Sequence, residues 1–89
     1  HAVELAQKHG HAVDDEDYCP GVIGLAVPVS TGSHGCVAAL TLSGPTTRMR
    51  ALVNEQTVAM LRETARAIGR SRSFLRALSR LEARTQTRD

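Results

Sequence analysis

Two apolar stretches, followed by one long periodic stretch, divide the chain. Residues 22–29 and 36–42 are rich in small and β-branched apolar side chains, and each is about one β-strand long. The six residues between them include two glycines, which can adopt positive φ, and three hydroxyl side chains, which can bond to nearby backbone. This pattern predicts an antiparallel β-hairpin whose second strand stops at the Ser-Gly-Pro sequence of residues 43–45.

Alternation along the second strand gives its two faces different chemistry. Thr41 and Ser43 point to one face, whereas Leu40 and Leu42 point to the other. Two hydroxyls on one face can hydrogen-bond a small polar molecule if something covers them from water. The alternative is an edge strand whose hydroxyls face solvent, since serine and threonine are mostly exposed in proteins.

The residues before the hairpin are more polar. Residues 2–8 contain good helix formers and predict the end of a helix, which His9-Gly10 stops. Residues 11–13 predict a short extended piece. The four consecutive acids of residues 14–17 predict a solvated loop, and Pro20-Gly21 predicts a tight turn into the first strand.

Apolar residues recur at helical spacing from residue 46 onward. Leu61, Ala65 and Ile68 form a stripe that Leu75 and Leu78 continue, which predicts an amphipathic helix. Glycine and serine residues at 69–73 predict that this helix ends or kinks near residue 69. A second helical piece is expected from about residue 74 to 83, and residues 84–89 are predicted to be frayed.

The charge of the chain is divided between its halves. The net charge of the 89 residues is +2, but residues 1–45 hold one lysine against five acids, and residues 46–89 hold ten arginines against four acids. We favour a solvated arginine face on an amphipathic helix, because the arginines are spread along it. The alternative is a basic tail that binds nucleic acid. Its arginines would be Arg70, Arg72, Arg76, Arg80 and Arg84.

Several classes of function lack their motifs in this sequence. It has no GxSxG elbow, no phosphate-binding glycine loop and no HExxH, so we expect no enzyme activity. The two cysteines and four histidines lack a recognised metal-ligand spacing, so we expect no metal and no cofactor. No signal peptide or membrane-spanning segment is visible, so a cytoplasmic protein is expected.

Four segments in order resemble one protein family. They are G-H-A-V-D-D-E-D-Y-x-P-G-V (10–22), L-A-V-P-V (25–29), A-A-L-T-L-S-G-P (38–45) and L-R-E-T-A-R-A-I (61–68). Together they resemble the C-terminal half of the effector-binding domain of IclR-family bacterial transcriptional regulators, over about residues 1–69. The resemblance implies a GAF-like sensor domain for a small metabolite, usually a carboxylate or aromatic acid. It also implies a DNA-binding winged helix N-terminal to that domain.

The resemblance assigns effector contacts to four residues, and two more are candidate pocket walls. The contacts are Asp14, Gly24, Thr41 and Ser43, and the walls are Val22 and Leu42. The hydroxyls and the backbone amides near Gly24 would donate to a ligand carboxylate, while Asp14 would accept from a ligand hydroxyl or order a loop over the ligand. Family members often have a cysteine or another small side chain in place of Gly24, so one possible contact is lost and the space is enlarged here.

These observations predict an α+β, GAF-like partial domain in which an antiparallel hairpin packs against a long C-terminal helix. Residues 1–69 would be the sensor part, and residues 70–89 a helical extension with a basic tail. The expected function is effector sensing and assembly into a homodimer or homotetramer, with DNA bound only through an N-terminal winged helix. The alternative is a dimerisation fragment that binds no ligand.

Overall fold

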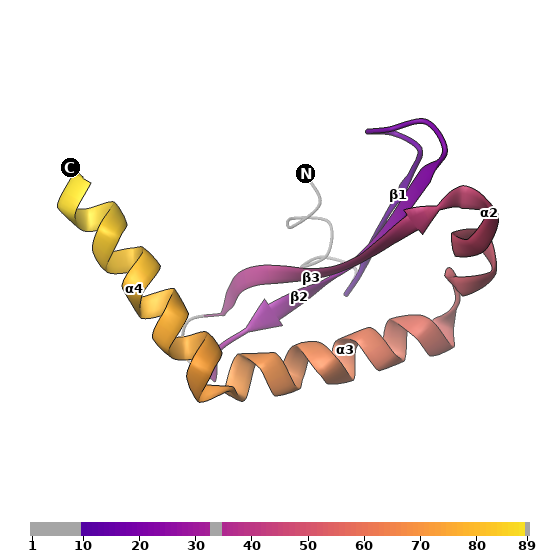
Figure 1. The fold of residues 1–89 in the computed structure, drawn as a ribbon. Coiled ribbons are helices and arrows are strands. Elements are labelled where there is room, and N and C mark those ends of the chain that lie inside the picture. The colour runs from indigo at the N-terminus through magenta and orange to yellow at the C-terminus, as the bar shows by residue number, and fades with distance from the viewer. Residues whose placement is uncertain (1–9, 33–34, 89) are drawn as a thin grey trace.

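The computed structural model describes residues 10–32 and 35–88, which form one three-stranded sheet and a set of helices. In chain order these are β1 (Ala12–Asp15), β2 (Val22–Ser30), β3 (Cys36–Pro45), α2 (Thr46–Met49), the 3₁₀ helix η2 (Arg50–Leu52), α3 (Glu55–Arg70) and α4 (Arg72–Arg88). Figure 1 shows the sheet lying along α3, with α4 extending away from both. The predicted α+β class is therefore confirmed, while the helix predicted over residues 2–8 lies outside the described residues.

The predicted hairpin is the centre of the sheet. Strands β2 and β3 pair antiparallel, and β1 pairs antiparallel with the other edge of β2, in the order β1-β2-β3. Both glycines of the hairpin loop have positive φ, as their positions predicted, with 37° at Gly32 and 67° at Gly35. The register shifts between Val29 and Ser30, where β3 contains one extra residue and forms a bulge.

The second strand is longer than the sequence predicted. It continues to Pro45, whereas the sequence predicted that it stops at Ser43-Gly44-Pro45. The extension is paired, because Ile23 lies opposite Gly44 and Val22 opposite Pro45. Proline is tolerated at position 45 because it is the last residue of β3, which is an edge strand of the described sheet. The sheet therefore loses no backbone hydrogen bond to the missing N–H.

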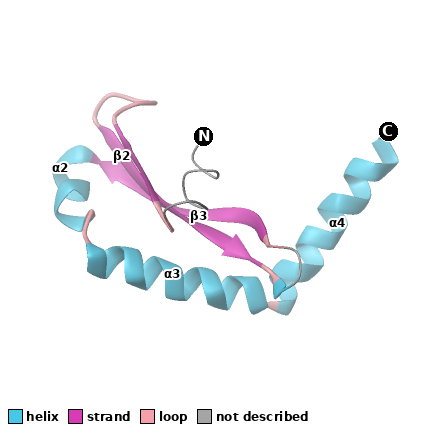
Figure 2. Cartoon of the chain, turned by 180° about the vertical axis from the view of Figure 1, so that it is seen from behind, coloured by secondary structure: helices cyan, strands magenta, loops and turns pink. Residues whose placement is uncertain are grey.

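The core lies between one face of β2 and helix α3. Ile23, Leu25, Val27 and Val29 alternate along β2, and each has at most 2% of its surface exposed. They point to the face that α3 covers, and Ala65 of α3 packs against Val27 and Val29. Figure 2 shows this arrangement from behind, with α3 lying along one side of the sheet.

The helical region is divided differently from the prediction. It begins with two short helices, α2 and η2, and α3 starts at Glu55 with Asn54 as its N-cap. The break falls at Ser71, which is extended at φ −71° and ψ 129°, and Gly69 stays inside α3. The Oγ of Ser71 accepts a hydrogen bond from the Phe74 amide at 3.3 Å and so caps α4.

The last helix is also longer than predicted. It extends to Arg88, so residues 84–88 are helical where the sequence predicted a frayed end. Because of the break at Ser71, α4 leaves the direction of α3 and moves away from the sheet, as both ribbon views show. The apolar stripe of α3 is therefore not continued along the core by α4. Among the described residues, no helix is long and apolar enough to cross a membrane.

Candidate ligand-binding site

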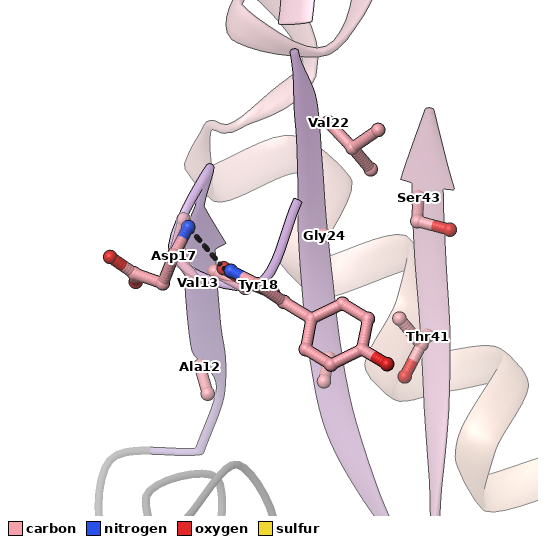
Figure 3. Close-up of a pocket in the computed structure, with 10 residues that line it drawn as sticks. Ala12, Val13, Asp17, Tyr18, Val22, Gly24, Thr41 and Ser43 are labelled. Carbon is pink, nitrogen blue, oxygen red and sulfur yellow. Dashed lines mark hydrogen bonds between the residues drawn. The ribbon is translucent and has the colours of Figure 1, made fainter. Parts of the chain in front are cut away.

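The sheet face opposite α3 contains a hollow of about 580 Å³. Its lining comes from all three strands and from the turn after β1. The lining residues are Ala12, Val13, Asp14, Asp17, Tyr18, Val22, Gly24, Ala26, Thr41 and Ser43. The hollow contains every effector contact that the resemblance implied, and it is drawn in Figure 3.

Strand pairing brings these residues together from distant parts of the sequence. Asp14 lies opposite Gly24, and Gly24 lies opposite Ser43, so the three form one row across the sheet. Two residues further along, Ala12, Ala26 and Thr41 form the next row on the same face. The polar side chains of the two rows thus surround alanine and glycine positions that leave room above the sheet.

Gly24 lies at the centre of this arrangement. A Cβ built at position 24 would lie 3.7 Å from the Cβ of Ser43, 3.7 Å from the Cγ2 of Thr41 and 3.9 Å from the Cβ of Asp14. Three polar side chains therefore converge on the position where residue 24 has no side chain of its own. A ligand atom can approach the sheet there more closely than at any position that has a Cβ.

The carboxylate of Asp14 orders the turn beside the hollow. Its Oδ1 accepts hydrogen bonds from the Asp17 amide at 2.9 Å and from the Tyr18 amide at 3.4 Å. Glu16 also holds the turn, since its Oε1 accepts from the Gly21 amide at 2.6 Å and its amide donates to the Val22 carbonyl at 3.1 Å. Asp14 is thus placed to order a loop at the site, one of the two roles that its hydrogen-bonding chemistry led us to expect.

The turn also brings an aromatic ring to the edge of the hollow. Tyr18 is 92% exposed and lines the hollow, and Figure 3 shows its ring extending from the turn, while the Asp17 carboxylate points away from β3. The sequence reasoning missed five lining residues, Ala12, Val13, Asp17, Tyr18 and Ala26. The alanines could have been found, because each is two residues from a predicted contact in an extended segment. Nothing in the strand pattern indicated Tyr18, which depends on the turn.

The charge of the described lining is negative. It includes the carboxylates of Asp14 and Asp17 and no lysine, arginine or histidine. The hydroxyls of Thr41 and Ser43 have no hydrogen-bond partner among the described residues, and both residues are exposed. This wall is therefore equipped to bond hydroxyl, carbonyl or amine groups, and it lacks the cation that commonly accompanies a bound carboxylate.

The two predicted pocket walls lie on opposite faces. Val22 is 36% exposed and lines the hollow. Leu42 pairs with the buried Leu25 and faces the helix layer, so it does not line the hollow. Leu42 lies between Thr41 and Ser43 in the sequence. Because successive side chains of a strand alternate between its two faces, Leu42 points to the opposite face.

A second hollow, of about 510 Å³, lies between the start of β1 and the start of α3. It is lined by His11, Val53, Asn54, Glu55, Val58, Ala59 and Arg62. The Nδ1 atom of His11 is buried there without a hydrogen-bond partner in the described structure. No group of three His, Cys, Asp or Glu side chains in residues 10–32 and 35–88 could hold a metal ion. None of the predicted contact residues lines this hollow.

A model of a known protein family matches most of the chain. A family model described as bacterial transcriptional regulator IclR C-terminal matches residues 1–70, which is more than three quarters of the chain. The match includes the whole sheet, α3 and every residue of the hollow, and it ends before α4. A search of curated proteins finds no match.

Proposed function

Because the chain belongs to the IclR family of bacterial transcriptional regulators, as the match over residues 1–70 shows, we propose that it senses a small-molecule effector in the hollow beside Gly24. The chain would bind the effector without converting it chemically. It would be the part of a cytoplasmic regulator that sets the regulator's state. A three-stranded antiparallel sheet with helices on one face is consistent with part of a GAF-like domain.

One observation supports this proposal more than any other. Asp14, Gly24, Thr41 and Ser43, the four contacts that the resemblance implies, come from three strands. Strand pairing places all four on one face, around one open position, in one hollow. If Thr41 and Ser43 were only solvated residues of an edge strand, β1 would not need to contribute a polar residue to the same group.

The lining also restricts how a ligand would be oriented. A carboxylate or aromatic acid is the class that the resemblance implies, yet the described wall is acidic. We therefore place the hydroxyl or carbonyl end of the effector against Thr41 and Ser43, with any aromatic ring beside Tyr18. The carboxylate of such a ligand would point away from Asp14, because two anions at short distance repel each other.

Binding would act through a population shift. A ligand that binds one arrangement of the assembled regulator more tightly than another biases the equilibrium by that difference in affinity. The turn at residues 14–18 is a suitable element for this, since it lines the hollow and Arg50 of η2 reaches it. The Arg50 guanidinium lies 3.3 Å from Asp15 and 3.5 Å from Glu16. In this proposal the transmitted response requires at least a homodimer.

A second candidate function is assembly without a ligand. β3 is a ten-residue strand that pairs only with β2 among the described residues, and the sheet face opposite α3 has no described helix over it. An open edge and face of this kind favour pairing with another chain. Under this alternative the hollow would be an interface surface, and its hydroxyls would contact protein.

An amide NMR titration distinguishes the two candidates. The chain would be titrated with a panel of hydroxylated carboxylates, aromatic acids and uncharged phenols, with its mass monitored by light scattering. Sensing predicts saturable shifts centred on Asp14, Gly24, Thr41 and Ser43. Concentration-dependent mass with no ligand-dependent shift would instead support assembly alone.

A matched pair of variants tests the site. Removing both hydroxyls, as Thr41→Ala with Ser43→Ala, is expected to weaken binding by about tenfold or more, because each lost hydrogen bond contributes roughly 1 kcal/mol. Thr47→Ala with Ser79→Ala removes two exposed hydroxyls outside the hollow and is the control. Equal affinity of the two double variants for a ligand found in the titration would reject the site.

A further inference from the structure

Helix α4 lies outside both the family match and the proposed sensor site. It begins at Arg72, two residues after the match ends, and it runs for 17 residues away from the sheet. Neither the core nor the hollow uses most of its surface, since all but two of its residues from 72 to 84 are exposed. A function for this helix therefore has to come from its own surface.

Arginine recurs every four residues along α4. The positions are 72, 76, 80, 84 and 88, against one acid, Glu82. A step of four residues advances by only about 40° around a helix, so the first arginines share one face. We call Arg72, Arg76 and Arg80 the arginine face.

This face points away from the rest of the protein. Arg76 and Arg80 each follow by two residues a half-buried apolar side chain, Phe74 and Leu78, and Phe74 packs against the core. Two residues correspond to about 200° around a helix, so each arginine lies almost opposite its apolar neighbour. The helix thus turns its apolar side toward the fold and its cations toward solvent.

No described residue neutralises the cations of the arginine face. Arg72, Arg76 and Arg80 are exposed and form no ion pair or hydrogen bond with any described residue. The acidic turn is engaged elsewhere, because Asp15 and Glu16 pair with Arg50 and Asp14 bonds to backbone amides. A row of unpaired guanidinium groups at a regular spacing is suited to an external polyanion.

We propose that the arginine face of α4 binds the phosphate backbone of duplex DNA without sequence preference, a property independent of effector sensing. A guanidinium group can donate two parallel hydrogen bonds to one phosphate. A helix of 17 residues spans about 25 Å, and duplex DNA presents one phosphate charge about every 1.7 Å of its axis. Each arginine of the face can therefore meet a phosphate. The proposal replaces two expectations, that this face is merely solvated and that DNA is bound only through an N-terminal winged helix.

The same helix is poorly suited to other anionic partners. Single-stranded nucleic acid requires aromatic rings on which bases stack, and the one aromatic residue of α4, Phe74, is packed against the core. A membrane surface requires a broad apolar face to insert, and α4 exposes only Leu75 and Leu81 as large apolar side chains. Backbone phosphates of a duplex require neither feature.

Salt dependence of binding tests the proposal directly. The whole 89-residue chain would be titrated against a mixed-sequence duplex at several salt concentrations. Arg76→Ala with Arg80→Ala should lower the slope of log affinity against log salt by about 1.8, and lower affinity by roughly tenfold, because two phosphate contacts are lost. Arg48→Ala with Arg66→Ala removes two other exposed arginines and should leave the slope unchanged. Alanine favours helix, so α4 should persist, as circular dichroism would show.

A charge-conserving variant keeps the test decisive. Arg76→Lys with Arg80→Lys should retain the salt slope but bind more weakly, since lysine cannot form the bidentate contact. Three results would overturn the proposal: no duplex binding at low salt, equal losses in the two alanine pairs, or a slope unchanged by the α4 pair. Tighter binding to anionic vesicles, single-stranded RNA or an acidic polypeptide than to the duplex would also reject it, and would identify the preferred polyanion.

Discussion

Gly69 of α3 lies so close to Ser30 of β2 that a Cβ at position 69 would overlap the Ser30 carbonyl oxygen. Glycine 69 is buried inside a regular helix, where its flexibility would ordinarily be a disadvantage. The absence of its side chain allows the end of α3 to touch the end of β2 directly.

Gly69→Ala should therefore destabilise the fold. In an open helix position the change would stabilise by about 1 kcal/mol, since alanine is the better helix former. Here the overlap with Ser30 forces α3 away from β2, at a cost of about 1–3 kcal/mol that we expect to exceed the gain. Urea unfolding would measure the net change. Ala67→Gly, at an exposed position of α3, gives the propensity effect alone, and an increased stability of Gly69→Ala would show that no such close contact exists.

Replacement by alanine should change the free energy of unfolding differently at two glycines of the strand region. Gly21 has φ of 80° in a turn closed by the Val22 amide and the Cys19 carbonyl, so Gly21→Ala should cost about 1–2 kcal/mol although the space around it is open. Gly24 has an ordinary strand conformation, and its added Cβ would make contacts of 3.7–3.9 Å, so Gly24→Ala should be neutral or slightly stabilising.

Urea unfolding of both variants checks this difference. Gly21→Asn is the intermediate case, because asparagine tolerates positive φ better than alanine does. The assignment of the turn would be wrong if Gly21→Ala and Gly24→Ala had the same free energy of unfolding.

The start of α3 depends on one asparagine. The Asn54 Oδ1 accepts from the Thr57 amide at 2.9 Å, and its Nδ2 donates to the Ala51 carbonyl at 3.0 Å. Asn54→Ala should cost about 1 kcal/mol, whereas Asn54→Asp keeps the acceptor and should stay near the wild type. Hydrogen exchange at the Thr57 amide would show the effect locally. Equal protection of that amide in all three proteins would contradict the cap.

The hairpin and the core could be predicted from the sequence because both depend on a period of two. Alternation in residues 22–29 and 36–42 indicates which side chains share a face, and the turn glycines fix the reversal between them. The end of β3 was mispredicted for a local reason. Ser-Gly-Pro usually stops a strand, but here each of the three residues is paired with β2.

Only part of the site could be predicted from the sequence in this way. Thr41 and Ser43 could be placed together from their spacing. The short segment at residues 11–13 did not by itself indicate that β1 pairs with the hairpin. Asp14 is opposite Gly24 only because β1 pairs with β2 over four residues. Tyr18 reaches the edge of the hollow through a turn that the Asp14 side chain holds. Long-range pairing of a short strand and side-chain bonding in a turn have no periodic signal in a single sequence.

Asp14 gives the last prediction, because it combines a structural and a proposed ligand role. Its Oδ1 accepts two backbone amides, so Asp14→Ala should release the turn, cost about 1 kcal/mol and speed hydrogen exchange at Asp17 and Tyr18. Asp14→Asn keeps an acceptor and should retain most of that protection. For an effector identified by titration, loss of affinity in Asp14→Ala alone would mean that Asp14 acts by ordering the turn. Equal loss in both variants would mean that its charge contacts the ligand. Unchanged exchange at both amides in Asp14→Ala would show that this side chain does not hold the turn.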